Sequence, residues 1–370
     1  MVTIPFFKKL TFPKFDFKLG GRDTSVVGID IGASSVKVVE LKEEGGRAIL
    51  KTYGELKTAG YLKKVDHERA MGGGFLRFLD TDIGKMVEDV IREAGVETKQ
   101  AVFSIPSVSS FVTLIDLPRL KEHEIAEAIP FEAKKYIPIP TAEVLLGWEV
   151  IDEGDPAIIK VLLVAVPHEI IEKYKRIADY AKLELRALEI EHFAMIRALV
   201  PKEKRSSVLL NIGDHSTNIA IVREGVLRLT HTIDRGAAEI TKVIAQGLGV
   251  AEERAEHFKK TIGLSDRPEE KEVSDIISPL VDALLHETAR IINVYNRSSK
   301  DHVDKLVLGG GGANLRGLLD YAVKLFGFEV VLGNPFARVV YPAFMQPMLK
   351  ELGPSFSVVV GLALREITSR

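Results

Sequence analysis

The stretch that predicts the fold is VVGIDIGASSVKVVEL, residues Val26–Leu41. It begins with apolar residues, as in a buried strand, and residues 36–41 alternate as in a strand that returns. The turn between them, residues 30–35, has mostly small side chains, which let a ligand approach the backbone closely. Successive N–H groups in such a turn can converge on an anion. The stretch therefore predicts a β-hairpin that either binds phosphate or is purely structural.

Asp30 stands at the end of the first strand, where a carboxylate can hold the hydration shell of Mg²⁺. Ser34 and Ser35 add hydroxyl donors to the turn. Two common phosphate-binding fingerprints fail here, because there is no G-x-G-x-x-G and no helix is predicted directly after the turn. This stretch is thus not a Rossmann or P-loop site.

The design of the first hairpin recurs later in the chain. Ser207–Gly225, SVLLNIGDHSTNIAIVREG, has an apolar strand, a turn of small and polar residues, and an alternating strand. A third glycine element, KLVLGGGGANLRGL at Lys305–Leu318, predicts a strand that leads into a helix. Periodicity also predicts strands at Ala48–Leu56 and Ala101–Ile105 and helices at Asp82–Gly95, Ala237–Leu248 and Ala251–Thr261.

Two hairpins followed by a glycine-rich strand-to-helix turn, in this order, resemble the phosphate-one, phosphate-two and adenosine motifs of the actin-like ATPase superfamily. The resemblance implies an α/β fold with a duplicated actin-like (ribonuclease H-like) core and nucleotide between the halves. The expected organisation is an N-terminal tail at 1–25, a first half at 26–205, and a second half at 206–370 with a helical subdomain at about 237–300. A strand–helix–strand–strand pattern indicates a small α+β subdomain inserted at about 107–166.

Within that superfamily, the chain most resembles the PilM family of type IV pilus assembly proteins. Glu132–Pro140, EAKKYIPIP, is similar to the family's E-A-x-x-Y-I-P-x-P motif, although Pro130 should interrupt the preceding helix. LGPSF at Leu352–Phe356 and GLALR at Gly361–Arg365 are similar to its closing segment. The resemblance implies a cytoplasmic, ATP-binding scaffold that binds the N-terminal cytoplasmic peptide of PilN and meets other pilus assembly proteins. Association with the inner membrane would then be indirect.

The resemblance also implies roles for particular residues. Asp30 would organise Mg²⁺, and Lys37 would reach a phosphate unless it is an exposed strand lysine. Glu256, Lys259 and Lys260 share one helical face, which would contact ribose and adenine or be a solvated charged face. The turn residues implied to line the phosphates are Gly32, Ala33, Ser34 and Ser35 in the first hairpin and Gly213, Asp214, His215, Ser216 and Thr217 in the second, with Gly310, Gly311 and Gly312 against the adenosine. The groove for the peptide would include Phe111, Ile115, Tyr136 and Ile137, each of which would also suit a core.

The second hairpin departs from the superfamily pattern at Asn211, where an aspartate is usual. An amide is neutral and cannot act as a carboxylate toward Mg²⁺ or the attacking water. We therefore expect nucleotide binding with slow or negligible hydrolysis, well below the usual enzyme median of roughly 10 s⁻¹. His192, His231 and His257 do not have the spacing of a metal site.

Composition narrows the choice of partners. The net charge is −2, so no overall positive field favours nucleic acid. The chain has no cysteine, which excludes disulfides and thiolate metal sites. The sequence contains no run of about 18 apolar residues, which is the length that would predict a membrane span. Met1–Arg22 is rich in phenylalanine and lysine and is either a peripheral membrane patch or a tail that packs on its own domain or stays loose.

Two other functions remain open at this stage. One is an FtsA-like division or filament protein, which needs a C-terminal amphipathic membrane helix that is not evident after Gly361–Leu364. The other is a small-molecule kinase of the same superfamily, for which Asp116 and Asp214 are available carboxylates but stand in no kinase motif.

Overall fold

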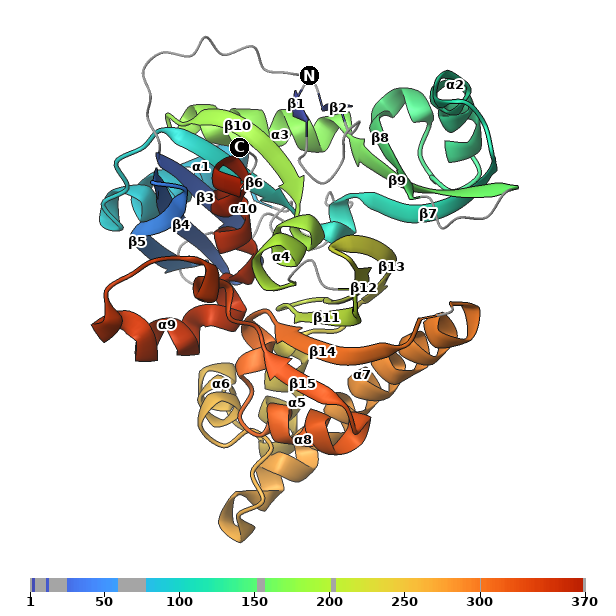
Figure 1. Cartoon of the computed structure of the whole chain (residues 1–370). Helices are drawn as coiled ribbons and strands as arrows, with labels where there is room; N and C mark the ends of the chain where they lie inside the picture. The colour runs from blue at the N-terminus through green and yellow to red at the C-terminus, as the bar shows by residue number, and fades with distance from the viewer. Residues whose placement is uncertain are drawn as a thin grey trace. The chain divides into compact units, whose positions relative to one another are not determined.

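The computed structural model describes residues 2–3, 11–12, 25–58, 78–151, 157–200, 204–299 and 301–368 (Figure 1). Most of the Phe/Lys-rich segment at residues 1–22 lies outside these ranges. The chain forms two compact units, Met1–Ala194 with Leu362–Arg370, and Met195–Gly361. It passes from one unit to the other inside helices α4 (Glu191–Leu199) and α10 (Ser357–Thr368), whereas the sequence boundary was expected at residues 205 and 206.

The first unit contains a five-stranded sheet with the order β10-β6-β3-β4-β5. The predicted hairpin is confirmed as β3 (Ser25–Ile31) and β4 (Ser35–Glu44), which are antiparallel. The other strands are β5 (Arg47–Lys57), antiparallel to β4, and β6 (Gln100–Ile105) and β10 (Glu184–Ile190), which are parallel to each other. Because β3 and β6 are also parallel, their carboxyl ends meet at the sheet edge that carries the first turn.

Helices α1 (Asp80–Glu93) and α3 (His168–Tyr180) lie side by side in this unit. The apolar stripe of α1 was predicted from sequence, and Ile83, Met86 and Val87 are buried. Gly84 permits the close approach, because a Cβ at this position would lie 2.4 Å from the Cβ of Tyr180.

The inserted subdomain is a three-stranded antiparallel sheet with one helix. The sheet has the order β7-β9-β8, from β7 (Phe111–Pro118), β8 (Val144–Ile151) and β9 (Ile158–Pro167). Helix α2 (Glu122–Ala133) packs its Ile125 and Ile129 against one face of this sheet. The helix was expected to be interrupted at Pro130, but it continues through this residue to Ala133. Residues 152–156, which join β8 to β9, lie outside the described residues.

The second unit repeats the topology of the first. Its sheet has the order β13-β12-β11-β14-β15. Strands β13, β12 and β11 are antiparallel to one another in turn, and β14 and β15 continue the sheet parallel to β11, which is the arrangement of the first sheet. The strands are β11 (Ser206–Ile212), β12 (Thr217–Arg223), β13 (Val226–Ile233), β14 (Val303–Gly309) and β15 (Glu329–Leu332). Strand β13 was not predicted from the sequence. The predicted duplicated α/β core with an inserted α+β subdomain is confirmed.

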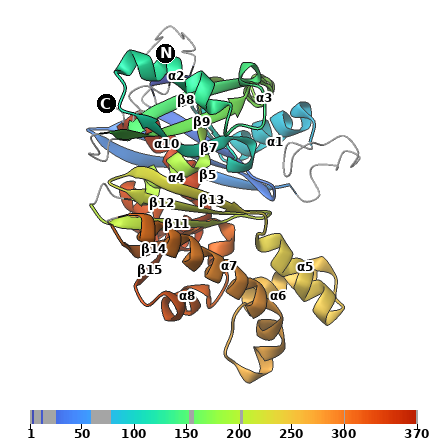
Figure 2. The same ribbon diagram turned by 90° about the vertical axis from the view of Figure 1, so that its right-hand side faces the viewer.

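Helices α5 (Ala237–Leu248), α6 (Glu252–Thr261) and α7 (Lys271–Ser298) lie beside one another in the second unit (Figure 2). Pro279 lies inside α7. Helix α8 (Leu318–Phe326) follows the third glycine element, and α9 (Gln346–Leu352) occupies a segment without helical periodicity in the sequence. The core between these helices and the sheet includes Leu210, Ile244, Ile277, Leu285 and Leu306.

Short 3₁₀ turns connect several of these elements; they span Ser107–Ser109, Thr141–Glu143, Pro268–Glu270, Gly311–Asn314, Pro335–Arg338, Ala343–Met345 and Gly353–Phe356. A separate pair of two-residue strands, β1 (Val2–Thr3) and β2 (Thr11–Phe12), is antiparallel. None of the helices in the described ranges has the length and apolar character of a membrane span.

Candidate functional site

The first turn is closed by a backbone hydrogen bond from the N–H of Gly32 to the carbonyl of Ser35, at 2.9 Å. Thr58, which directly follows β5, makes two hydrogen bonds to the turn. Its N–H donates to the carbonyl of Ser34 (3.0 Å) and its hydroxyl donates to the carbonyl of Ala33 (2.9 Å). These contacts fix the carbonyl groups of the turn, and Ser34 remains exposed at its tip.

Asp30 and Lys37 are directly paired across the β3–β4 ladder. The hydroxyl of Ser104 on β6 donates to Oδ1 of Asp30 at 2.6 Å, which fixes the orientation of this carboxylate. The Lys37 side chain is only 12% exposed and lies 3.5 Å from Oε1 of Glu55. Its Nζ donates to the Ser35 hydroxyl at 2.8 Å. Lys37 is therefore not an exposed strand lysine, and its ammonium group is held beside the turn.

A second group of polar residues interacts with the first turn's Asp30, and no pattern in the sequence predicts it. Burial raises the pKa of Glu191, at the start of α4, to about 7; a hydrogen bond from Ser107 lowers it and the Asp30 charge raises it further. The N–H of Ser107 donates to Oε1 of Glu191 at 3.0 Å. Burial, with smaller effects of Asp30 and Glu191, also raises the pKa of Tyr174. These residues come from distant parts of the chain, so only the fold brings them to Asp30.

The second turn reproduces the closure of the first. The N–H of Gly213 donates to the carbonyl of Ser216 at 2.9 Å, the same distance as in the first turn. Helix α5 begins on this turn, since the N–H groups of Ala237 and Ala238 donate to the carbonyls of Gly213 and Asp214. A Cβ on Gly236 would lie 2.4 Å from the Asp214 carbonyl oxygen, so this approach requires glycine.

The matching positions of the two turns share a further property. Within the described part of the chain, the N–H groups of Ala33 and Ser34 donate to no acceptor, and neither do those of Asp214 and His215. Neighbouring N–H groups without protein acceptors are the donors that an anion requires. Both turns are therefore chemically suited to a phosphate oxygen.

The charges beside the two turns differ. Asn211 pairs with Asn218 across the second ladder, at the positions that Asp30 and Lys37 occupy in the first. Asn211 is 7% exposed. Thr217 is fully buried, and its hydroxyl donates to the carbonyl of Arg235 at 2.8 Å. His215 is 61% exposed and its Nε2 lies 3.6 Å from Oδ2 of Asp214. The paired strand positions that carry Asp30 and Lys37 beside the first turn thus carry neutral amides beside the second.

The third glycine element lies against the second turn within the same unit. Gly310 has φ +82°, and a Cβ on it would lie 2.5 Å from Oδ1 of Asn211 and 2.4 Å from the carbonyl oxygen of Ile212. A Cβ on Gly312 would meet the Ile212 side chain at 2.3 Å. Gly311, in contrast, has nothing within 4 Å of its Cβ position. The loop is tightly packed on both sides of one open glycine.

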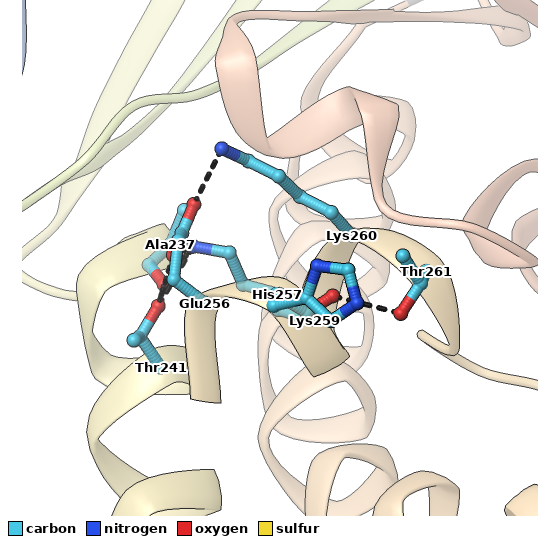
Figure 3. A network of polar contacts seen from close by, with 7 residues as sticks. All are labelled: Ala237, Thr241, Glu256, His257, Lys259, Lys260 and Thr261. Atoms are coloured by element: carbon cyan, nitrogen blue, oxygen red, sulfur yellow. Dashed lines mark hydrogen bonds and ion pairs between the residues drawn. The ribbon is translucent and has the colours of Figure 1, made fainter. Parts of the chain in front are cut away.

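Glu256, Lys259 and Lys260 form a polar cluster that joins α6 to α5 (Figure 3). Oε2 of Glu256 accepts from the Thr241 hydroxyl (2.7 Å) and lies 2.5 Å from Nζ of Lys259. Lys259 is 12% exposed and also donates to the carbonyl of Ala237, whereas Lys260 is 57% exposed and 3.2 Å from Oε1 of Glu256. Burial raises the pKa of Glu256, but hydrogen bonds from Lys259 and Thr241 outweigh it and lower that pKa to about 2.

We expect Lys259→Met to destabilise the second unit by about 1 kcal/mol at pH 7, a value reduced for solvent screening because Glu256 is 37% exposed. The lowered pKa contributes stability above pH 4.5 that is lost as the pH falls toward 2. NMR titration should show the Glu256 pKa rising toward 4.5 in this variant. Lys260→Met is the matched control and should change stability by less than about 0.5 kcal/mol. Equal effects of the two substitutions would contradict this assignment.

A cavity of about 220 Å³ lies beside the second turn, within the second unit. Its walls are mainly aliphatic and come from β11, β13, α5, α7 and the third glycine element, including Ile212, Gly236 and Gly312. No residue of α6 lines it, so the Glu256 cluster lies on another side of α5.

The remaining predicted residues belong to the insert. Ile115 and Ile137 are buried in its core, at 2% and 6% exposure, whereas Phe111 and Tyr136 are exposed. In the described ranges, no group of three or more His, Asp or Glu side chains is placed to hold a metal ion.

The comparisons with known proteins agree with this architecture. The model of the family described as "Type IV pilus assembly protein PilM" matches residues 28–367. A solved PilM-PilN type IV pilus biogenesis complex matches with a TM-score of 0.78 and 24% identity, covering 92% of this chain and 98% of that chain. MreB5 of Spiroplasma citri bound to ADP matches with a TM-score of 0.51 and 14% identity, covering 93% and 96%. The cell division protein FtsA of Streptococcus pneumoniae serotype 2 (strain D39) is 22% identical over 362 residues, covering 85% of this chain and 76% of that protein.

Proposed function

Because the chain belongs to the PilM family of type IV pilus assembly proteins, we propose that it is a nucleotide-binding scaffold that holds the N-terminal cytoplasmic peptide of PilN. The family model spans nearly the whole chain, and the similar solved structure is a complex with PilN. In this proposal the protein works at the cytoplasmic side of the inner membrane, where it is retained by PilN and other pilus assembly proteins.

The paired turns are the observation that supports nucleotide binding. Each presents two neighbouring N–H groups without a protein acceptor, at matching positions of two hairpins with the same closing hydrogen bond. We assign the phosphates of ATP to Gly32, Ala33, Ser34, Ser35 and Lys37 in the first unit and to the turn of Gly213, Asp214, His215 and Ser216 in the second. Thr217 would stabilise this turn through its buried hydroxyl, which donates to the carbonyl of Arg235.

The nucleoside is assigned to the second unit. Gly311 leaves open space at its Cβ position, and Gly310 and Gly312 hold the loop against the second turn. Lys260 and Oε1 of Glu256 are the polar groups of the α6 cluster that remain accessible to a ribose, because Lys259 is bonded inward. Mg²⁺ would neutralise phosphate charge beside Asp30, whose orientation is fixed by Ser104. The neutral Asn211 at the second turn favours slow hydrolysis or none.

The nucleotide assignment predicts that Asp30→Asn weakens ATP binding in the presence of Mg²⁺ by about tenfold, equivalent to about 1.4 kcal/mol. The carboxylate would no longer hold the hydrated ion, while the hydrogen bond from Ser104 can be kept by an amide oxygen. Calorimetric titration with ATP, with and without Mg²⁺, measures this difference. Without Mg²⁺ the variant should bind ATP at least as tightly as the wild type, because one negative charge has been removed. An equal loss under both conditions would contradict the assignment of Mg²⁺ to Asp30.

The peptide is assigned to the face of the insert sheet that α2 does not cover. The ladder places Leu114 of β7, Leu162 and Val164 of β9, and Leu145 of β8 on this face. None of these residues belongs to the core on the α2 side. Two carboxylates also lie on this face: Asp116, which is paired with Lys160, and Glu149, whose pKa burial raises to about 7. A face of aliphatic side chains with one acid, Glu149, that has no ion pair to the described residues suits an extended apolar peptide that carries positive charge.

We expect Leu114→Asp to weaken binding of a synthetic PilN N-terminal peptide by at least about tenfold, because it places a charge among the apolar contacts. Val150→Asp is the matched control. It lies in the same sheet but on the opposite face and is exposed, so it should leave the affinity unchanged within about twofold. Calorimetry measures both, and circular dichroism confirms that both variants are folded. Equal losses, or binding by neither variant nor wild type, would refute this docking face.

The similarity to FtsA supports a second candidate, an ATP-dependent filament-forming protein. Sedimentation with ATP and Mg²⁺ separates the two functions. Long polymers in the absence of any peptide would favour the filament, whereas a non-sedimenting protein that binds the PilN peptide would favour the scaffold.

A further inference from the structure

The centre of the insert-sheet face assigned to the peptide is already covered in this chain. Leu162 and Val164, in the central strand β9, are each only 1% exposed. Their neighbours Val161 and Leu163 point to the α2 side and are buried by the helix. Since α2 lies on that other side, Leu162 and Val164 are covered by a part of the protein other than α2.

The N-terminal segment reaches this part of the insert. The Cα atoms of β2 come within 8 Å of those of β8, the edge strand that carries Leu145 and Glu149 (Figure 1). Strand β2 pairs with β1 and does not extend the ladder of the insert sheet. Residues 13–24, which join β2 to β3, can span up to about 40 Å when extended.

The composition of residues 1–24 matches the chemistry of the face. The segment contains five phenylalanines and carries four lysines and one arginine against two aspartates. Glu149 has no hydrogen bond or ion pair to any of the described residues, although burial disfavours its charged form. A positively charged, apolar segment supplies both the hydrophobic cover and a counter-charge for this carboxylate.

We propose that residues 1–24 are an internal competitor that docks on the insert face formed by Leu114, Leu145, Leu162 and Val164 and must leave before the PilN peptide binds. This inference rests on the peptide assignment made above. A docked tail lowers the apparent affinity for the peptide by the fraction of molecules in which the face is free. If the tail occupies the face nine-tenths of the time, the peptide binds about tenfold more weakly than to the open face.

The test uses the full-length chain with Thr11→Pro and Phe12→Asp, which remove a backbone donor and add negative charge within β2. The control is Phe344→Asp, which replaces an exposed phenylalanine of the second unit by the same charged residue, outside the tail and the insert. Two measurements are made on each protein: amide hydrogen exchange of β8, and calorimetric titration with the PilN peptide. We expect faster exchange of β8 and about tenfold tighter peptide binding in the β2 variant only. A synthetic peptide of residues 1–24 should restore the protection of β8.

The two measurements separate this inference from the proposed function. Equal exchange of β8 in wild type and β2 variant would show that the tail does not dock, whatever the peptide does. Faster exchange with unchanged peptide affinity would show that the tail docks without competing, which also overturns the inference. Faster exchange in a protein that does not bind the peptide in either form would uphold docking of the tail and reject PilN as the ligand of this face.

Discussion

Replacing Gly310 by alanine is expected to destabilise the second unit by about 3 kcal/mol. Gly310 has φ +82°, a region in which an L side chain is strained. Its Cβ would also lie 2.4 Å from the carbonyl oxygen of Ile212 and 2.5 Å from Oδ1 of Asn211. The backbone of β11 cannot move away without breaking its ladders to β12 and β14. Urea unfolding followed by circular dichroism measures the loss.

Gly311→Ala is the matched control for stability and also the probe of the ligand. It has no atom within 4 Å of its Cβ position, so the substitution should change stability by less than about 0.5 kcal/mol. If the adenosine lies against this glycine, Gly311→Val should weaken ATP binding by at least about tenfold in a protein of normal stability. Unchanged ATP affinity in Gly311→Val would place the nucleoside elsewhere, and a large loss of stability in Gly311→Ala would contradict the open space at this position.

The sequence predicted the elements whose pattern is local. The two hairpins were predicted because apolar alternation and a turn of small residues are both contained within about twenty residues. Helix α5 has the predicted bounds, since Gly249 ends it in the left-handed conformation. The duplicated topology followed from finding the same hairpin twice.

What the sequence did not predict depends on contacts between distant residues. Strand β13 has a mixed pattern because its burial alternates weakly along the strand. Helix α9 has a proline in its first turn, and a proline in the sequence is usually taken to end a helix and not to begin one. The orientation of Asp30 by Ser104 joins residues 74 positions apart. The inward bonding of Lys259 to Thr241 likewise depends on the packing of α6 against α5.

Glu191 and His192 are expected to make opposite contributions to the pH dependence of stability. Burial raises the pKa of Glu191 to about 7, so the folded state retains a proton that the unfolded chain releases near 4.5, and stability falls as the pH rises from 4.5 to 7. Burial lowers the pKa of His192 to about 4, so the unfolded chain binds a proton that the folded state excludes, and stability rises from pH 4 to 6.5. Each effect amounts to about 3 kcal/mol, and they cancel in the wild type.

Single substitutions should uncover the two contributions. Relative to wild type, Glu191→Gln should gain about 3 kcal/mol of stability between pH 4.5 and pH 7, because only the His192 effect remains. His192→Gln should lose about the same amount between pH 4 and pH 6.5, and the double variant should follow the wild type. Urea unfolding at half-unit steps of pH measures the four curves. Both residues contact Ser107, through its N–H to Glu191 and its hydroxyl 2.7 Å from Nδ1 of His192, so an amide at either position retains a hydrogen-bonding group. Parallel curves for the single variants and the wild type would show that neither pKa is shifted by the fold, and Asp30 would then lie beside an ordinary ionised carboxylate.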